Sequence, residues 1–260
     1  PVAMTDFAYF MQLVGAATGA AVRRGYALVL SSETDARDSV LGQVPVDGGI
    51  VIDPIRRDPD VKRLRALGAP VVTIGRVPGE PDGNWVDNDH SKGMRSVLDH
   101  LAKRGAGRIA LVGIPLTTTY ADDTTGAYTR WCEATGSRPQ IEHARDFTEA
   151  AGFEAAMALL RSRPRPDAIC APLDRLALGV LLAAETAGIA VPAELLVAGI
   201  TNSEASRRSR PSLTALDLHP ESVGANAVNL LLDLVEGRDP PEPRMVVPTR
   251  LISRSSTRRR

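Results

Sequence analysis

The sequence lacks the short motifs that most nucleotide-dependent enzymes and hydrolases carry. It contains no G-x-S-x-G nucleophile elbow, no phosphate-binding P-loop and no G-x-G-x-x-G dinucleotide fingerprint. No two of its four histidines are at the spacing of metal ligands. We therefore expect a protein that is not an enzyme, with no catalytic residues, no metal and no cofactor. The four histidines are His90, His100, His143 and His219.

The chain also lacks an excess of charge of either sign, since 31 basic and 31 acidic residues leave a net charge of zero. Such a balance argues against a surface that binds nucleic acid or membranes by charge alone. No apolar run is long enough to span a bilayer, and the first ten residues lack the basic region of a secretory signal. A cytoplasmic location is expected.

Cysteine is scarce, with only Cys132 and Cys170 in 260 residues. One disulfide is possible by number. Cys170 lies within an apolar run that reads as a buried strand, which favours a buried free thiol.

The most informative stretch that is present runs from Pro166 to Ile200 and predicts a strand, a helix and a second strand. Ala168–Ala171 and Leu195–Ile200 are apolar throughout, and apolar residues recur between them at helical spacing. Asp174 is expected to cap this helix, and Gly188 to end it. Two apolar strands joined by a helical crossover indicate a parallel sheet covered on both faces, which binds ligands at the carboxyl ends of its strands.

Similar alternation before and after this stretch predicts an α/β fold in two successive series, with a break near Asp87–Asp89. His90 completes a polar cluster there, which we interpret as caps and turns at the break. The remaining expected strands are Tyr26–Leu30, Gly49–Ile52, Pro70–Ile74, Val86–Asn88, Arg108–Ile114, Gln140–His143, Leu213–Leu218 and Met245–Ile252. The first helix is expected to be capped by Asp6 and to run to about Arg24.

Several long segments resemble the effector-binding core of the lactose-repressor (LacI/GalR) family of bacterial transcription regulators. They are VDNDHSKGMRSVLDHLAKRGAGRIALVG, PDAICAPLDRLALGVLLAAETAGIAVPAELLVAGI, RPSLTALDLHPESVGANAVNLLLDLVEG and the ending VVPTRLISRSST. The resemblance covers nearly the whole chain, and the ending distinguishes this family from periplasmic sugar-binding relatives.

The resemblance implies a periplasmic-binding-protein-like fold: two Rossmann-like lobes with parallel sheets, joined by three crossovers near Asp87, Leu216 and Met245. The N-terminal lobe would comprise residues 1–88 plus 217–243, and the C-terminal lobe residues 89–216 plus 244–260. Family members are usually homodimers with an N-terminal helix-turn-helix headpiece, which we expect to be absent from this chain.

In the family a small effector binds between the lobes, and several positions carry over by resemblance. Tyr9 and Phe10 match an aromatic pair that borders the ligand, and Phe147 matches an aromatic position that stacks on ligand rings. For each of them, packing in the core is the alternative.

The polar positions depart from the family pattern. Asp123 stands where the family often has arginine, and Leu173-Asp174 where it often has Asn-Asp. Thr201 follows a strand where an acidic pair is common, and Arg76 lies next to Gly75, which replaces an aspartate.

These departures remove groups that suit sugar hydroxyls, because an arginine fork and amide or carboxylate acceptors are lost. Although the family implies a sugar-like effector, we interpret the site as one for a less polar or a cationic molecule that faces Asp123. Two alternatives remain open: Asp122 or Asp123 faces solvent, or the site has lost its ligand.

The resulting interpretation is a regulator whose effector changes the angle between the lobes, and with it the operator DNA binding of the headpiece. Its expected partners are a small molecule, operator DNA and a second copy of the chain, with no membrane. The alternative is the solute-binding protein of a transporter, which would share the fold and the cleft.

Overall fold

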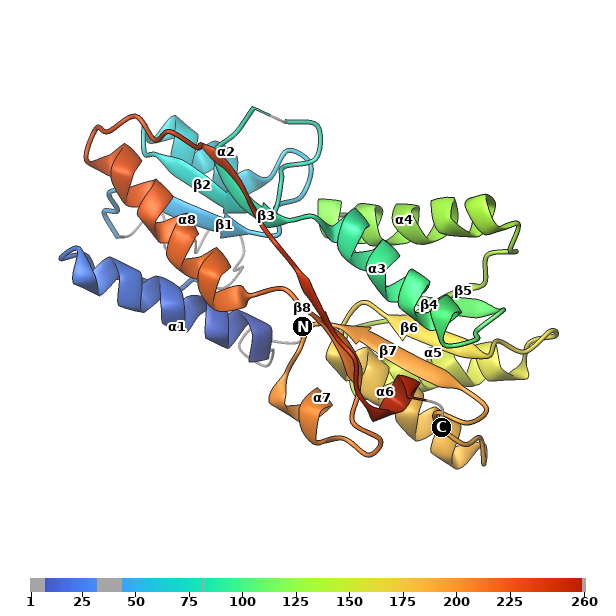
Figure 1. Cartoon of the computed structure of the whole chain (residues 1–260). Coiled ribbons are helices and arrows are strands. Elements are labelled where there is room, and N and C mark those ends of the chain that lie inside the picture. The colour runs from blue at the N-terminus through green and yellow to red at the C-terminus, as the bar shows by residue number, and fades with distance from the viewer. Residues whose placement is uncertain (1–7, 32–43, 81, 259–260) are drawn as a thin grey trace.

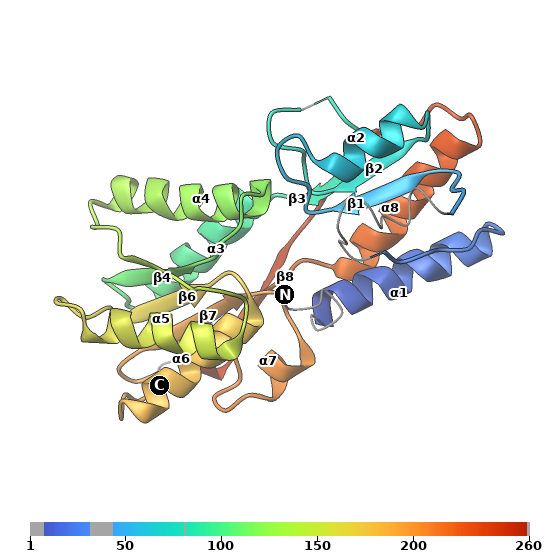
Figure 2. The same cartoon turned by 180° about the vertical axis from the view of Figure 1, so that it is seen from behind.

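The computed structural model describes residues 8–31, 44–80 and 82–258. It has two parallel sheets side by side, each covered by helices on both faces (Figures 1 and 2). The α/β class and the periplasmic-binding-protein-like arrangement predicted from the sequence are confirmed. Among the described residues, no helix combines the length and the apolar composition needed to cross a bilayer.

The first lobe is built on a four-stranded parallel sheet in the order β1-β2-β3-β9. Its core lies between this sheet and the helix pair α1 and α8, where buried residues such as Leu13, Val72, Val86 and Ala227 meet. The elements are α1 (Ala8–Arg23), β1 (Gly49–Ile52), α2 (Pro59–Ala66), β2 (Val71–Ile74), β3 (Trp85–Asn88), α8 (Pro220–Val235) and β9 (Arg244–Val247).

The second lobe is built on a six-stranded sheet in the order β10-β8-β7-β6-β4-β5, parallel except for β10. Every residue of β4, β6 and β7 is buried, as their continuously apolar sequences predict. Its elements are α3 (His90–Lys103), β4 (Ile109–Gly113), α4 (Thr119–Thr135), β5 (Ile141–His143), α5 (Glu149–Arg161), β6 (Ala168–Ala171), α6 (Asp174–Thr186), β7 (Leu196–Ile200), α7 (Glu204–Arg208), β8 (Thr214–Asp217), β10 (Arg250–Ile252) and the 3₁₀ helix η3 (Ser255–Thr257).

Three chain segments connect the lobes: β3 to α3, β8 to α8, and β9 to β10 (Figure 1). The third differs from the prediction. The sequence suggested one strand over Met245–Ile252 and placed residues from 244 onward in the second lobe. Instead, Arg244–Val247 pairs with β3 of the first lobe and Arg250–Ile252 with β8 of the second. Pro248, which has no N–H to donate, lies between the two strands.

Two further local predictions were wrong. Tyr26–Leu30 forms no strand, because no strand of the described residues pairs with it, although Tyr26 and Leu28 still pack against α1 and α8. Asp174 is not the cap of α6: Leu173 occupies that position, and the Asp174 carboxylate accepts from the N–H of Arg175 at 2.9 Å.

Other predictions were confirmed. Gly188 follows the end of α6 with a φ of 68°, the left-handed conformation that glycine adopts at little cost. Cys132 and Cys170 are buried free thiols, and burial raises the pKa of Cys170 to about 12. The proposed cap Asp6 and the neighbouring Phe7 lie outside the described residues.

Candidate functional site

The site lies where the carboxyl ends of the two sheets meet. In the first lobe, Asp53 follows β1, Arg76 follows β2 and Asp87 belongs to β3. In the second lobe, α4 carries Tyr120 and Asp123 shortly after β4. Loops that follow parallel strands collect at one edge of a sheet, which explains why distant parts of the sequence assemble here.

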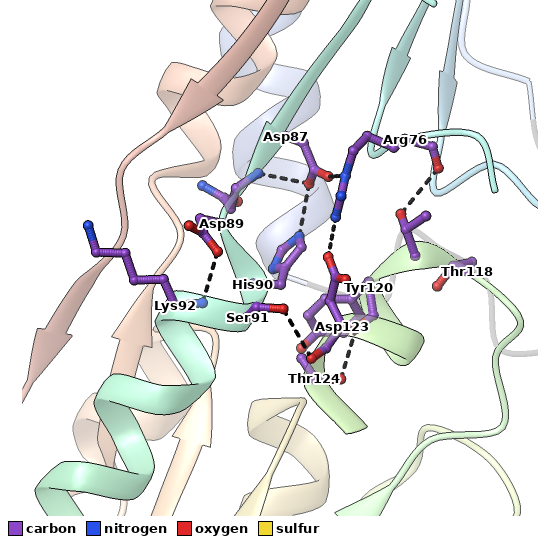
Figure 3. A network of polar contacts seen from close by, with 12 residues as sticks. Arg76, Asp87, Asp89, His90, Ser91, Lys92, Thr118, Tyr120, Asp123 and Thr124 are labelled. Atoms are coloured by element: carbon purple, nitrogen blue, oxygen red, sulfur yellow. Dashed lines mark hydrogen bonds and ion pairs between the residues drawn. The ribbon is translucent and has the colours of Figure 1, made fainter. Parts of the chain in front are cut away.

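Arg76 binds two carboxylates, Asp87 in its own lobe and Asp123 in the other lobe (Figure 3). Its Nε donates to Asp87 Oδ2 at 2.9 Å, and its guanidinium also forms an ion pair with Asp123 on α4. The Asp87 side chain is 4% exposed, whereas those of Arg76 and Asp123 are 36% and 26% exposed. The inner bond is therefore buried, and the bond that joins the lobes lies closer to solvent.

His90, on the first turn of α3, completes the buried part of this network. Its Nε2 lies 2.9 Å from Asp87 Oδ1, and its ring meets that of Tyr120 edge-on with centroids 4.7 Å apart. Burial acts to raise the pKa of Asp87, but the hydrogen bond and charge of His90, together with Arg76, hold that pKa below its ordinary value. The Asp87 carboxylate is therefore ionised at neutral pH.

Two further contacts between the lobes, each of which includes a backbone group, lie beside Arg76. Ile55 of the first lobe forms an antiparallel bridge with Thr118 of the second, and the Thr119 hydroxyl donates to the Arg76 carbonyl at 3.1 Å. We call the Arg76–Asp123 ion pair and these two contacts the interlobe latch. In this structure the latch is closed.

The carboxylate of Asp53 lies near the same network but accepts no hydrogen bond from the described residues, although its backbone N–H donates to the Ile74 carbonyl at 2.8 Å. Its φ of 50° is the left-handed conformation, which is uncommon for residues other than glycine. Burial and the negative charge of Asp87 raise its pKa to about 6, although the charge of His90 acts in the opposite direction. A half-buried carboxylate without a donor is costly in the absence of a ligand.

A cavity of about 70 Å³ opens between the lobes near the second crossover. Thr201 is buried in its wall, has a φ of 92°, and accepts from the Asp174 N–H at 3.1 Å. Asn202 is fixed from both sides: its amide donates to Asp217 at 3.3 Å, and its carbonyl accepts from Arg254 at 2.5 Å. The lining residues are Tyr9, Gln12, Asp174, Thr201, Asn202, Ser203, Arg207, Asp217, Leu218, Pro220 and Glu221.

The structure brings some of the predicted site residues together. Tyr9, Asp174 and Thr201 line this cavity, while Arg76 and Asp123 meet at the latch. Asp123 faces a guanidinium, which differs from the prediction that it is a free carboxylate for a cationic ligand. Its role in ligand binding stays a prediction.

The other three predicted residues lie beside packed regions. The Phe10 ring packs edge-on against Tyr9, with centroids 5.6 Å apart. Phe147 and Leu173 are partly buried against the core of the second lobe. No described contact links either of them to the cavity or to the latch.

Sequence reasoning missed Asp53, His90 and Tyr120. The cluster at residues 87–90 was interpreted as caps and turns, which is correct only for Asp89, whose carboxylate accepts from the Lys92 N–H at 2.8 Å. Asp53 could have been found, because it directly follows the apolar strand Gly49–Ile52. Within the described residues, no group of three or more His, Cys, Asp or Glu side chains is arranged to hold a metal ion.

Comparison with known proteins identifies the family. The periplasmic binding protein-like domain matches residues 98–257, well over half of the chain. The chain belongs to this family. It is the effector-binding core of a LacI/GalR-type regulator, as its relatives indicate.

These relatives include the HTH-type transcriptional repressor PurR from Escherichia fergusonii, which is 28% identical over 97% of this chain and 77% of its own length. PurR from Salmonella paratyphi B is 27% identical with the same coverage. Among solved structures, the transcriptional regulator CelR in complex with cellobiose has a TM-score of 0.88 at 26% identity and covers 96% of this chain and 79% of its own. A LacI family regulator from Bifidobacterium animalis has a TM-score of 0.87 at 25% identity, covering 96% and 94%.

Proposed function

We propose that this LacI/GalR-type core binds a small-molecule effector between its lobes and that the effector controls operator DNA binding. The observation that carries this proposal is the interlobe cavity, which takes Tyr9 from the first lobe and Asp174 and Thr201 from the second. A ligand that contacts both lobes has different affinities for their open and closed arrangements. That difference in affinity is what shifts a conformational equilibrium.

In this proposal the lobes divide after residue 88, near residue 217 and at residues 248–249. The interlobe latch is the element of the structure that switches between a closed and an open state. It is held by one partly exposed ion pair and two polar backbone contacts, so a modest ligand free energy is enough to open or reinforce it.

The protein functions as a cytoplasmic homodimer without enzymatic activity. DNA contact is made by an N-terminal helix-turn-helix headpiece that precedes this core, and two headpieces at a fixed distance read two half-sites. The alternative, a transporter's solute-binding protein, is not favoured, because the relatives named above are transcriptional regulators.

Exposed apolar residues support the dimer. Met11 and Val22 on α1 are 47% and 63% exposed, and Leu182 on α6 is 44% exposed. Leu182 borders a groove of about 590 Å³ whose rim carries two glutamates and two arginines. A surface with both charges is self-complementary, so a second copy related by a two-fold axis pairs glutamate with arginine twice.

Analytical ultracentrifugation of Leu182→Glu tests the dimer. We expect the wild type to sediment as a dimer and the variant to dissociate, because a buried unpaired carboxylate opposes association. Leu67→Glu is the control, since Leu67 is 59% exposed but lies on the first lobe away from the groove. A dimer in both variants would contradict this surface.

A thermal-shift screen with sugars, nucleobases, amino acids and amines tests the effector proposal. A compound that binds only the folded protein raises the melting temperature by mass action. We expect the effective compound to lose its effect in Asp174→Asn and to keep it in Asp122→Asn, because Asp122 is exposed on α4 and does not line the interlobe cavity. Small-angle scattering then measures whether that compound changes the radius of gyration. A compound that binds without any change in shape would contradict the coupling.

A further inference from the structure

Two hydrogen-bond acceptors at the strand ends of the first lobe lack a donor among the described residues. One is the carboxylate of Asp53, which has no partner among the described residues. The other is Nδ1 of His90, an atom that is buried without a hydrogen bond on a residue that is only 7% exposed. Asp53 follows Ile52, which pairs with Ile74 and through it with Val86, next to Asp87, whose carboxylate contacts His90, so both acceptors lie at the same strand ends.

The partner of His90 Nε2 determines what its Nδ1 offers. Asp87 is an ionised carboxylate that only accepts hydrogen bonds, so Nε2 carries the proton and donates to it at 2.9 Å. In the neutral ring, Nδ1 is then a lone-pair acceptor. Asp53 and His90 therefore both require a donor, and a group with several N–H bonds is suited to both.

The local charge balance favours a positive donor. Arg76 is already shared between Asp87 and Asp123, which leaves Asp53 and Asp174 without a cationic partner among the described residues. Burial, together with the charges of both carboxylates, raises the pKa of Tyr120. Among the described residues, these two carboxylates have no cation that neutralises them.

Aromatic rings border the same space. Tyr9 lines the cavity and is electrostatically coupled to Asp53 and Asp87, while Tyr120 packs on His90. A cation next to such rings gains an additional attraction to their faces. Tyr9 thus connects the unpartnered acceptors to the open volume of the cavity.

We propose that the effector is a small organic cation, an ammonium or an amidinium, whose N–H groups donate to the Asp53 carboxylate and to His90 Nδ1. This inference rests on the proposed function, because it assumes that the interlobe site binds the effector. It assigns the cation to Asp53 and leaves Asp123 in the latch. The left-handed backbone of Asp53 is consistent with this role, since strained conformations are retained where function requires them.

Isothermal titration calorimetry with matched probes tests the proposal. The pairs are benzylamine with benzyl alcohol and benzamidine with benzamide, in which only the charge and the N–H donors change substantially. Glucose and cellobiose are the neutral sugars. The variants are Asp53→Asn and the control Asp82→Asn, because Asp82 has an 86% exposed side chain at the surface of the first lobe.

We expect at least one cation to bind the wild type and Asp82→Asn at least tenfold more tightly than its neutral partner, and Asp53→Asn to abolish that preference. Affinity should also fall about tenfold from pH 7.5 to pH 5, as Asp53 takes up a proton with a pKa of about 6. Asp87 and Arg76 keep their charges over this range, because the pKa of Asp87 is lowered and that of Arg76 is raised.

Three results would overturn the inference. If a sugar binds and no cation does, the inference fails while the effector site stands. If neither class binds and no compound of the thermal-shift screen does, the inference and the proposed function both fail. If cations bind equally well to Asp53→Asn, the assignment to Asp53 is wrong. Circular dichroism of each variant establishes that it is folded.

Discussion

The two lobes share one architecture but differ in how completely they are buried. In the second lobe, the central strands β4, β6 and β7 are inaccessible along their whole length. In the first lobe, the inner strands β2 and β3 each begin with a half-buried residue, and the edge strand β1 is half-buried at all four positions. The buried apolar core of the second lobe also comprises more residues than that of the first, so apolar burial stabilises the second lobe more.

This difference shows how a symmetric fold can divide stability from function. Buried apolar strands and helix contacts stabilise the second lobe, while Asp53, Arg76 and Asp87 place polar groups at the edge of the first. Each lobe contains one tryptophan, Trp85 on β3 and Trp131 on α4, so fluorescence of single-tryptophan variants reports on each lobe separately.

The largest effect is expected from Gly179→Ala, in the contact between α5 and α6. A Cβ at this position would lie 2.2 Å from the Glu149 carbonyl oxygen and 2.5 Å from the Phe153 nitrogen, and both are backbone atoms that cannot move independently. We expect a loss of about 3 kcal/mol or more in the free energy of unfolding. Urea unfolding monitored by Trp131 in a Trp85→Phe background measures it.

The matched change in the first lobe is Gly224→Ala, which would approach the Leu13 carbonyl oxygen at 2.2 Å in the contact between α8 and α1. We expect about half the loss, because α1 covers a smaller core and can shift. Gly15→Ala is the control: nothing lies within 4 Å of its added Cβ, and alanine is the better helix former. Equal losses for Gly179→Ala and Gly224→Ala would contradict the difference between the lobes.

The next largest effect on the free energy of unfolding is expected from removing the charge of Asp53 in the first lobe. A carboxyl whose pKa is raised on folding binds more protons in the folded state, so its ionised form destabilises the fold at higher pH. With a pKa of about 6 against 3.8, ionised Asp53 opposes folding by about 2–3 kcal/mol at pH 7. We expect Asp53→Asn, which also tolerates the left-handed backbone, to stabilise the protein by about that amount.

The gain from Asp53→Asn should shrink as the pH falls through 6 and become small near pH 4, and it is lost completely only below 3.8, the ordinary pKa of the unfolded carboxyl, where the folded and unfolded states are both protonated. Thermal denaturation of the wild type and the variant between pH 4 and 8 measures this profile. A gain that does not depend on pH would show that the effect is unrelated to ionisation.

The smallest effect is expected at the latch, where the lobes meet. Because the Arg76–Asp123 pair is partly exposed, Asp123→Asn should cost less than about 1 kcal/mol of stability. It should nevertheless increase the radius of gyration in small-angle scattering, because the lobes are then held mainly by two polar backbone contacts. Asp122→Asn is the matched control on the same helix, and equal radii for both variants would show that the ion pair does not hold the lobes.

Much of the fold could be predicted because its periodicity is local. The parallel strands, the crossover helix after Ala171 and the left-handed glycine at 188 all follow from short patterns of apolar residues and turn residues. The failures occurred where pairing partners decide the outcome. Tyr26–Leu30 has the sequence of a strand, but no strand of the described residues pairs with it. Pro248 separates two strands within Met245–Ile252, which the sequence predicts as one strand.

The candidate site shows the same division. Residues that follow apolar strands, such as Arg76, Asp174 and Thr201, could be predicted because they directly follow strand ends. The contacts of those residues could not be predicted. Asp123 is 47 positions from Arg76 in the sequence, and their ion pair forms only when the two lobes come together. Asp87 and His90 were misread for the same reason, because a cap and a buried ion pair have the same local sequence.

By itself, the sequence determined the class of fold, the family and the residue types at the strand ends, because hydrophobic periodicity and turn chemistry act over a few residues. The tertiary structure alone decided which charges find partners: Arg76 pairs with Asp87 and Asp123, and within the part of the chain that the structure describes the Asp53 carboxylate and His90 Nδ1 have no donor. The physical reason is that electrostatic pairing depends on distance in space and on burial, and both are set only when the two lobes come together.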